Sequence, residues 1–100
     1  MIIMTQFEQY LNSIHVQMFD AEPCHKADKG IGNYVIYAYV DRLPVPLAAF
    51  DSKINAETAA FAIYEMIRKG AGSVDVRDVV RAIEDPEGEL EPFEQEGRRG

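Results

Sequence analysis

One segment constrains the fold more than any other, because its pattern predicts a long amphipathic helix. Apolar side chains recur at helical spacing along one arc of residues Asn55–Gly70. Asn55 is a suitable N-cap, and Gly70 is a suitable first residue beyond the helix. The expected core-facing arc consists of Ala56, Ala59, Ala60, Ala62, Ile63, Met66 and Ile67. Such a helix is stable only when this arc packs against another layer of structure.

Phe61 is out of place in this pattern, because it lies near the middle of the polar side of the helix. An aromatic ring among charged residues has to be covered by a partner protein, by a second copy of the chain or by the chain's own tail. We therefore predict a contact surface on this side of the helix, with Glu57, Phe61 and Glu65 as partner-binding residues.

The strongest strand signal is Tyr34–Asp41, which is rich in aromatic and β-branched residues. Both of its faces are apolar, so an inner strand is expected. Val45–Phe50 should form the next strand, and Pro46 favours an edge strand or a late start because proline lacks an N–H group. Tyr37 and Tyr39 share one strand face and suit either a core edge or a binding surface; we include both among the partner-binding residues.

Weaker patterns complete the expected fold. The spacing Thr5-Gln6-Phe7-Glu8 is that of a capping box and predicts a helix over 5–12. Alternation of apolar and polar residues predicts a strand at Ile14–Met18, and a long loop is expected over Asp20–Asn33. The C-terminal part of the domain should contain a strand at 73–77 and a helix at 78–84. We expect an α+β domain in which two to three helices pack mainly on one face of a small antiparallel sheet of three to four strands.

Two resemblances are limited to topology and a short motif. The predicted order α-β-β-β-α is similar to that of double-stranded-RNA-binding domains, but the segment Asp51-Ser52-Lys53-Ile54-Asn55-Ala56-Glu57, with a single basic residue, stands where those domains carry a basic cluster. The stretch Gly32–Ile67, with Leu43-Pro44 between its strands, faintly resembles HicB-type antitoxin domains, although Val45 replaces the usual glycine. Neither resemblance implies a function for this chain.

The negative charge of the chain is concentrated at its C-terminal end. The formal net charge is -7, but residues 1–83 hold ten acidic and eight basic residues, whereas residues 84–100 hold seven acidic and two basic ones. We expect a single domain over 1–85 and a flexible acidic tail over 86–100, in which Leu90 and Phe93 are apolar anchors for a partner or for Phe61. The charge argues against direct binding to nucleic acid or to a membrane surface.

The sequence contains no recognisable catalytic or metal-binding motif. Cys24 and His25 are adjacent, a spacing that does not match known zinc sites, and Cys24 is the only cysteine. No cofactor, metal or catalytic residue is predicted, and the chain is more consistent with a non-enzyme. A reducing, cytoplasmic compartment is the default for such a chain.

These features favour a small acidic protein-binding regulator or inhibitor that masks the surface of a partner. The partner would be a protein, for example a basic or nucleic-acid-binding one, whose cleft accepts carboxylates in place of phosphates. In size and charge the chain resembles phage and mobile-element accessory proteins, including anti-CRISPR inhibitors. Two alternatives stay open: a small-ligand-binding or enzymatic domain with its site near the 20–33 loop, and a homodimeric structural domain built on the Phe61 face.

Overall fold

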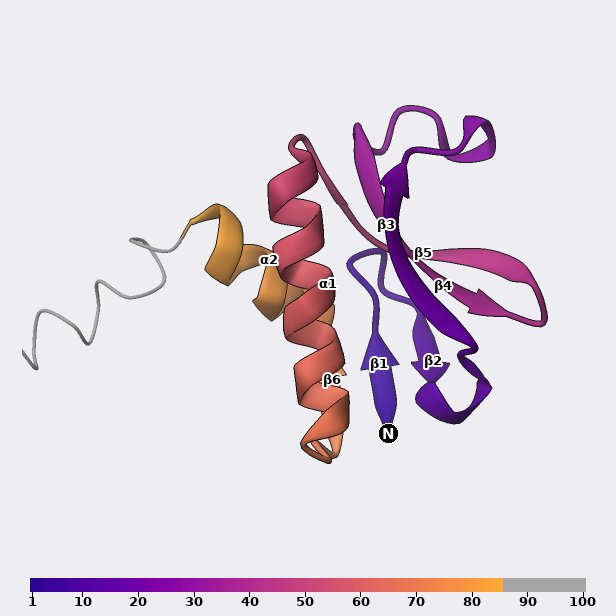
Figure 1. The fold of residues 1–100 in the computed structure, drawn as a ribbon, viewed down its shortest axis with the longest axis vertical. Helices are drawn as coiled ribbons and strands as arrows, with labels where there is room; N and C mark the ends of the chain where they lie inside the picture. Colours follow the sequence, from indigo (N-terminus) through magenta and orange to yellow (C-terminus); the bar gives the residue numbers. More distant parts are fainter. Residues whose placement is uncertain (86–100) are drawn as a thin grey trace, which may run out of the picture.

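Residues 1–85 form two small β-sheets and two α-helices, an α+β arrangement (Figure 1). The computed structural model describes residues 1–85. In chain order their elements are β1 (Ile2–Met4), β2 (Tyr10–Asn12), the 3₁₀ turn η1 (Ser13–His15), β3 (Met18–Pro23), the 3₁₀ turn η2 (Lys26–Asp28), β4 (Tyr34–Val40), β5 (Leu43–Phe50), α1 (Lys53–Arg68), β6 (Ser73–Asp75) and α2 (Val76–Glu84).

The larger sheet is antiparallel and has the order β3-β4-β5, so β4 is its inner strand and β5 an edge, both as predicted. Asp41 and Arg42 make the turn between β4 and β5 and both have positive φ angles, the conformation of a tight hairpin turn. The pairing register shifts between Ile36 and Tyr37. β5 begins at Leu43 and includes Pro46, which an edge strand accommodates although proline has no N–H group.

The smaller sheet has the order β2-β1-β6, and a turn followed by β2 replaces the helix predicted over 5–12. That prediction is wrong because Thr5 caps a turn rather than a helix. Its buried hydroxyl accepts hydrogen bonds from the N–H groups of Phe7 and Gln9, both at 3.1 Å. The chain therefore reverses direction after β1, which pairs antiparallel with β2 and parallel with β6.

The next predicted boundaries are also displaced. The strand predicted at Ile14–Met18 is wrong, because η1 occupies residues 13–15 and β3 begins only at Met18. Asn12 stabilises this turn by accepting a hydrogen bond from the N–H of Ile14. The strand then continues to Pro23, into the segment predicted as a loop, and that loop is reduced to a shorter connection containing η2.

The helical half of the chain agrees closely with its sequence pattern, except that Met66, which was expected on the core-facing arc, is exposed. The side chain of Ser52, rather than that of Asn55, caps α1 by accepting a hydrogen bond from the N–H of Asn55. Gly70 follows the helix with a φ of 81°, as expected for a glycine at this position. The strand and helix predicted after Gly72 are β6 and α2. Neither α-helix of residues 1–85 is long and apolar enough to cross a membrane.

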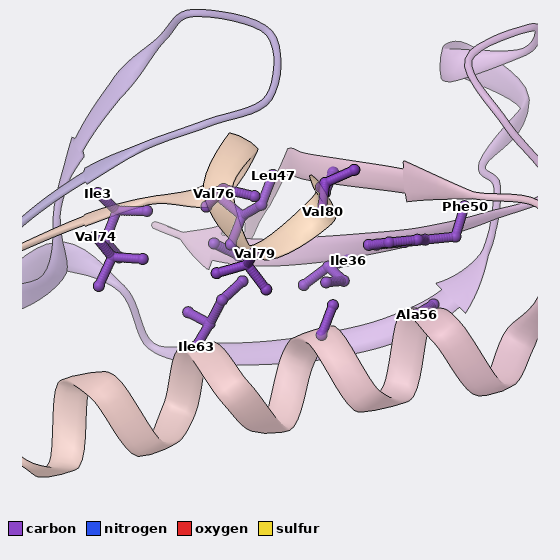
Figure 2. Close-up of a cluster of buried hydrophobic side chains, with 13 residues drawn as sticks. Ile3, Ile36, Leu47, Phe50, Ala56, Ile63, Val74, Val76, Val79 and Val80 are labelled. Carbon is purple, nitrogen blue, oxygen red and sulfur yellow. The ribbon is translucent and has the colours of Figure 1, made fainter. Parts of the chain in front are cut away.

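Both helices pack on the same face of the larger sheet and enclose the main hydrophobic core (Figure 2). Side chains of α1, such as Ile63 and Ala56, point toward Ile36 of β4 and toward Val79 of α2. The smaller sheet extends this core through Ile3 and Val74. A second, smaller cluster lies on the opposite face of the larger sheet, where Val35, Tyr37 and Ala49 are buried beneath the connection between β3 and β4.

The predicted acidic tail over 86–100, with Leu90 and Phe93, lies outside the described residues. The division into a domain and a tail therefore stays a prediction.

Candidate functional site

An apolar groove runs between α1 and the region of the chain from η1 to the start of β3. Its volume is about 530 Å³. The groove is lined by Ser13, Val16, Gln17, Met18, Phe19, Ala60, Phe61, Tyr64 and Ile67. Segments that are about forty residues apart in the sequence thus form one surface. Figure 1 shows the ribbons of α1 and β3, the elements that carry most of its residues.

Large apolar side chains at the groove are exposed to solvent. Phe61 is 64% exposed, Tyr64 52% and Met18 50%. Single exposed apolar residues are common on protein surfaces, but several that gather around a hollow mark a contact surface more strongly. The out-of-place Phe61 identified from the sequence is therefore part of a larger apolar surface.

Within residues 1–85, the strand beside this groove, β3, pairs on one side only, with β4, so its other edge is open. Cys24 lies opposite Asn33 in the register of β3 and β4, and its N–H donates to the carbonyl oxygen of Asn33 at 3.0 Å. In an antiparallel pair, directly opposed residues alternate between hydrogen-bonded and non-hydrogen-bonded pairs. Phe19 and Ala21 therefore occupy non-hydrogen-bonded positions, and their main-chain N–H and C=O groups point away from β4.

The opposite edge of the same sheet is closed in part by Gln6. The N–H of Gln6 donates to the carbonyl oxygen of Leu47 at 2.7 Å, and its side-chain oxygen accepts from the N–H of Ala49 at 2.8 Å. Pro44 and Pro46 protect the other end of that edge because they have no N–H to offer. The two edges of the sheet therefore differ, and the edge beside the groove is the one available for further pairing.

The predicted acidic contacts on α1 lie in different settings. Glu57 is exposed. Glu65 is half-buried and accepts two hydrogen bonds from the guanidinium of Arg68, at 2.9 and 3.0 Å, and these bonds lower its pKa. Both residues stay predicted contacts, and the ion pair already engages Glu65 within the helix.

The two predicted tyrosines lie on the opposite face of the sheet from the groove. Tyr37 is fully buried, so its side chain offers no contact surface in this structure. Its hydroxyl donates to Oδ2 of Asp28 at 2.8 Å and accepts from the N–H of His25 at 2.9 Å. Tyr39 is half-buried, and its hydroxyl donates to the carboxylate of Glu22 at 2.8 Å. The tyrosines thus attach the β3–β4 connection to the sheet.

The ionisation of this cluster is set by its hydrogen bonds. Burial acts to raise the pKa of Glu22, but the bonds from His25 at 2.7 Å and from Tyr39 outweigh it and lower that pKa. The pKa of neighbouring Asp20 is raised by partial burial and by the Glu22 carboxylate. Burial likewise raises the pKa of Tyr37 far above its ordinary value. The pKa values of the two carboxylates are therefore shifted in opposite directions.

A second hollow, of about 620 Å³, lies beside this cluster and is lined by Cys24, His25, Lys26, Lys29, Gly30, Gly32 and Asn33. The thiol of Cys24 donates hydrogen bonds to the carbonyl oxygens of Asp28 at 3.2 Å and His25 at 3.5 Å. These bonds hold the connection between β3 and β4 in place. Within residues 1–85, no group of three or more His, Cys, Asp or Glu side chains is arranged so that it could hold a metal ion.

Sequence reasoning found Phe61 but missed its neighbours in the groove. Tyr64 follows Phe61 by three residues, and this spacing on the helix could have identified it. Met18 could not be assigned to the surface, because nothing in the sequence shows that β3 lies beside α1. Predicted contacts at Leu90 and Phe93 lie outside the described residues.

Comparison with known proteins gives no relative: no protein-family model, curated protein or solved structure matches this chain.

Proposed function

We propose that this protein is a small regulator that binds an extended segment of a partner protein as an added strand at the edge of β3. Binding masks that segment of the partner. The observation that carries the proposal is the open edge of β3 beside the apolar groove. Strand addition of this kind obtains affinity from main-chain hydrogen bonds and specificity from pockets for alternate side chains. Both requirements are present on one side of the molecule.

The surroundings of the edge suggest the chemistry of the segment. Phe19 and Ala21 lie on the core-facing side of β3, so apolar side chains of an added strand would enter the groove on that side. Asp20 and Glu22 lie on the other side, where they favour basic side chains. The best ligand is therefore a strand that alternates apolar and basic residues.

One local contact has to be replaced when the strand binds. The Asp20 carboxylate accepts a hydrogen bond from the N–H of Ala21, its neighbour along the chain. Ligand carbonyl groups would take over this donor, and the freed carboxylate would then be available to a basic side chain of the ligand.

The groove is a better candidate than the hollow at the β3–β4 connection. In that hollow His25 and Cys24 bond to other groups of the chain, which assigns them a structural role. Phe61 and Tyr64, in contrast, expose more than half of their surface. Exposed aromatic residues gain most from burial in an interface.

The proposal can be tested with a displayed library of random peptides, selected on the immobilised full-length protein. We expect enrichment of peptides that alternate apolar and basic residues, with affinity that falls as salt rises. Ala21→Pro removes an outward N–H without removing a bond to β4, and Phe61→Asp places a charge at the groove. Both should weaken binding of the enriched peptides at least about tenfold.

Leu43→Asp is the matched control, because Leu43 is 67% exposed and is not part of the groove. Binding should be unchanged in this variant. Selection without enrichment, or equal binding by Phe61→Asp and the unmodified protein, would show that the groove is not the binding surface. If Phe61→Asp weakened peptide binding and Ala21→Pro did not, the peptides would bind in the groove without adding a strand to the sheet.

A further inference from the structure

Helix α1 carries an exposed stripe that differs from both its buried face and the rest of its polar side. The stripe consists of Ile54, Glu57, Phe61, Tyr64 and Arg68, all of which are exposed. Successive members are three, four, three and four residues apart, the spacing of the contact positions of a coiled coil. The core-facing residues of α1, such as Ala59 and Ile63, lie on a different side of the helix.

This stripe is complementary to itself when two copies of the helix run antiparallel. A twofold axis that passes between Phe61 and Tyr64 places Phe61 against Tyr64 of the second copy. By the same symmetry, Tyr64 lies against Phe61 of the second copy. The same register places Glu57 against Arg68 of the second copy. Four layers result, two aromatic ones at the centre and one ion pair at each end, and every contact occurs twice by symmetry.

Charge favours this register over its neighbour. If the axis passed through Phe61 itself, Glu57 would face Glu65 of the second copy, and like charges would meet at both ends. In the favoured register Arg68 is already held by Glu65 of its own chain, at 2.9 and 3.0 Å. That ion pair fixes the guanidinium before association and reduces the side-chain entropy that is lost on binding.

We infer that the protein forms an antiparallel homodimer through this α1 stripe. The inference goes beyond the proposed function and does not require it. The two nevertheless share Phe61 and Tyr64, so a dimer covers part of the groove. Dimer formation and binding of a partner segment are therefore mutually exclusive, and dilution of the dimer exposes the binding surface.

The test is a charge exchange read out by sedimentation velocity on the full-length protein. At high micromolar concentration the unmodified chain should sediment at twice its chain mass of 11.3 kDa. Glu57→Arg brings two guanidinium groups together at each end of the helix pair, and Arg68→Glu brings two carboxylates together there. Either variant alone should raise the dimer dissociation constant at least about tenfold, because like charges oppose one another twice.

Mixing the two variants restores opposite charges at both ends of the helix pair, so an equimolar mixture should dimerise although neither component does. Lys69→Glu is the matched control, since it reverses a charge next to the stripe but outside it and should leave the dimer intact. The mixture also shows that both variants are folded.

A chain that remains monomeric at high micromolar concentration would overturn the inference. A dimer that is unaffected by either charge reversal, or variants that do not dimerise when mixed, would overturn it as well. None of these outcomes bears on the peptide selection, so the failure of the dimer and the failure of the proposed function are distinguishable.

Discussion

The imidazole ring of His25 stacks on the phenol ring of Tyr37, with ring centroids 3.9 Å apart and an angle of 14° between the planes. The stacked pair lies on the face of the larger sheet opposite the one that α1 and α2 cover. Because the N–H of His25 also donates to the hydroxyl of Tyr37, the loop is attached to the sheet through both packing and hydrogen bonding.

Tyr37→Phe should test this attachment. The change keeps the stacked ring but leaves the N–H of His25 and the carboxylate of Asp28 without the hydroxyl, so we expect a loss of about 1–3 kcal/mol in the free energy of unfolding. Chemical denaturation measures the loss. Tyr39→Phe is the control, and its cost should be smaller because water can reach the Glu22 carboxylate. Equal costs for the two variants would contradict the assignment of Tyr37 as the anchor.

Asp20 and Glu22 should have opposite effects on the pH dependence of stability. The pKa of Glu22 is lowered in the folded protein, so its stabilising contribution is present above its unfolded pKa of about 4.5 and is lost as the pH falls through the folded value. Glu22→Gln should therefore reduce stability near neutral pH and have little effect in acid.

The pKa of Asp20 is raised, so its carboxylate destabilises the folded protein near neutral pH. Asp20→Asn should increase stability there, and this gain should disappear in acid. Denaturation curves at several pH values would reveal both trends. Parallel behaviour of the two variants would show that the carboxylates do not titrate as this geometry requires.

Gly32 should tolerate no side chain. A Cβ atom added there would lie 2.8 Å from the Cβ of Ala49, too close for two carbon atoms that are both held by the backbone. Gly32→Ala should therefore destabilise the protein by about 1–3 kcal/mol, the usual cost of overpacking. Gly72→Ala is the matched control, because nothing lies within 4 Å of its added Cβ. Thermal unfolding measures both variants, and only Gly32→Ala should show a lower midpoint than the unmodified protein.

Two residues that lie two positions apart on α1 should differ sharply in their contribution to stability. Ile63 is fully buried and Phe61 is 64% exposed. Ile63→Ala should cost about 2–5 kcal/mol because it leaves a cavity in the core. Phe61→Ala should change the free energy of unfolding of the monomer by about 0.5 kcal/mol or less. A large loss from Phe61→Ala at low protein concentration would mean that Phe61 belongs to the core and not to a contact surface.

The parts of the fold that follow from local pattern were predictable. Residues 53–68 repeat their apolar side chains at helical spacing, and Tyr34–Val40 is a strand by composition, so both elements could be recognised without their surroundings. The alternation and the helical spacing after Gly72 overlapped in the sequence, and the structure contains both a strand and a helix there.

The N-terminal strands could not be predicted, because their stability comes from distant partners. Ile3 is buried between Leu11 and Val74, and no local pattern indicates the second of these contacts. The capping-box spacing from Thr5 to Glu8 favoured a helix, but Glu8 adopts a positive φ angle within a turn. The same limit applies to the candidate site: Phe61 was recognisable from its helix, whereas the edge of β3 beside it was not.

The parallel pairing of β1 with β6 has a consequence for synthesis of the chain. Ile3 and Val74 are about seventy residues apart, so β1 leaves the ribosome long before the strand that completes its sheet. Until then β2 is the only strand with which β1 can pair, and a two-stranded hairpin is not stable alone. The protein therefore acquires its final structure late in translation, once β6 and α2 have emerged, and shorter nascent chains should remain accessible to chaperones and proteases.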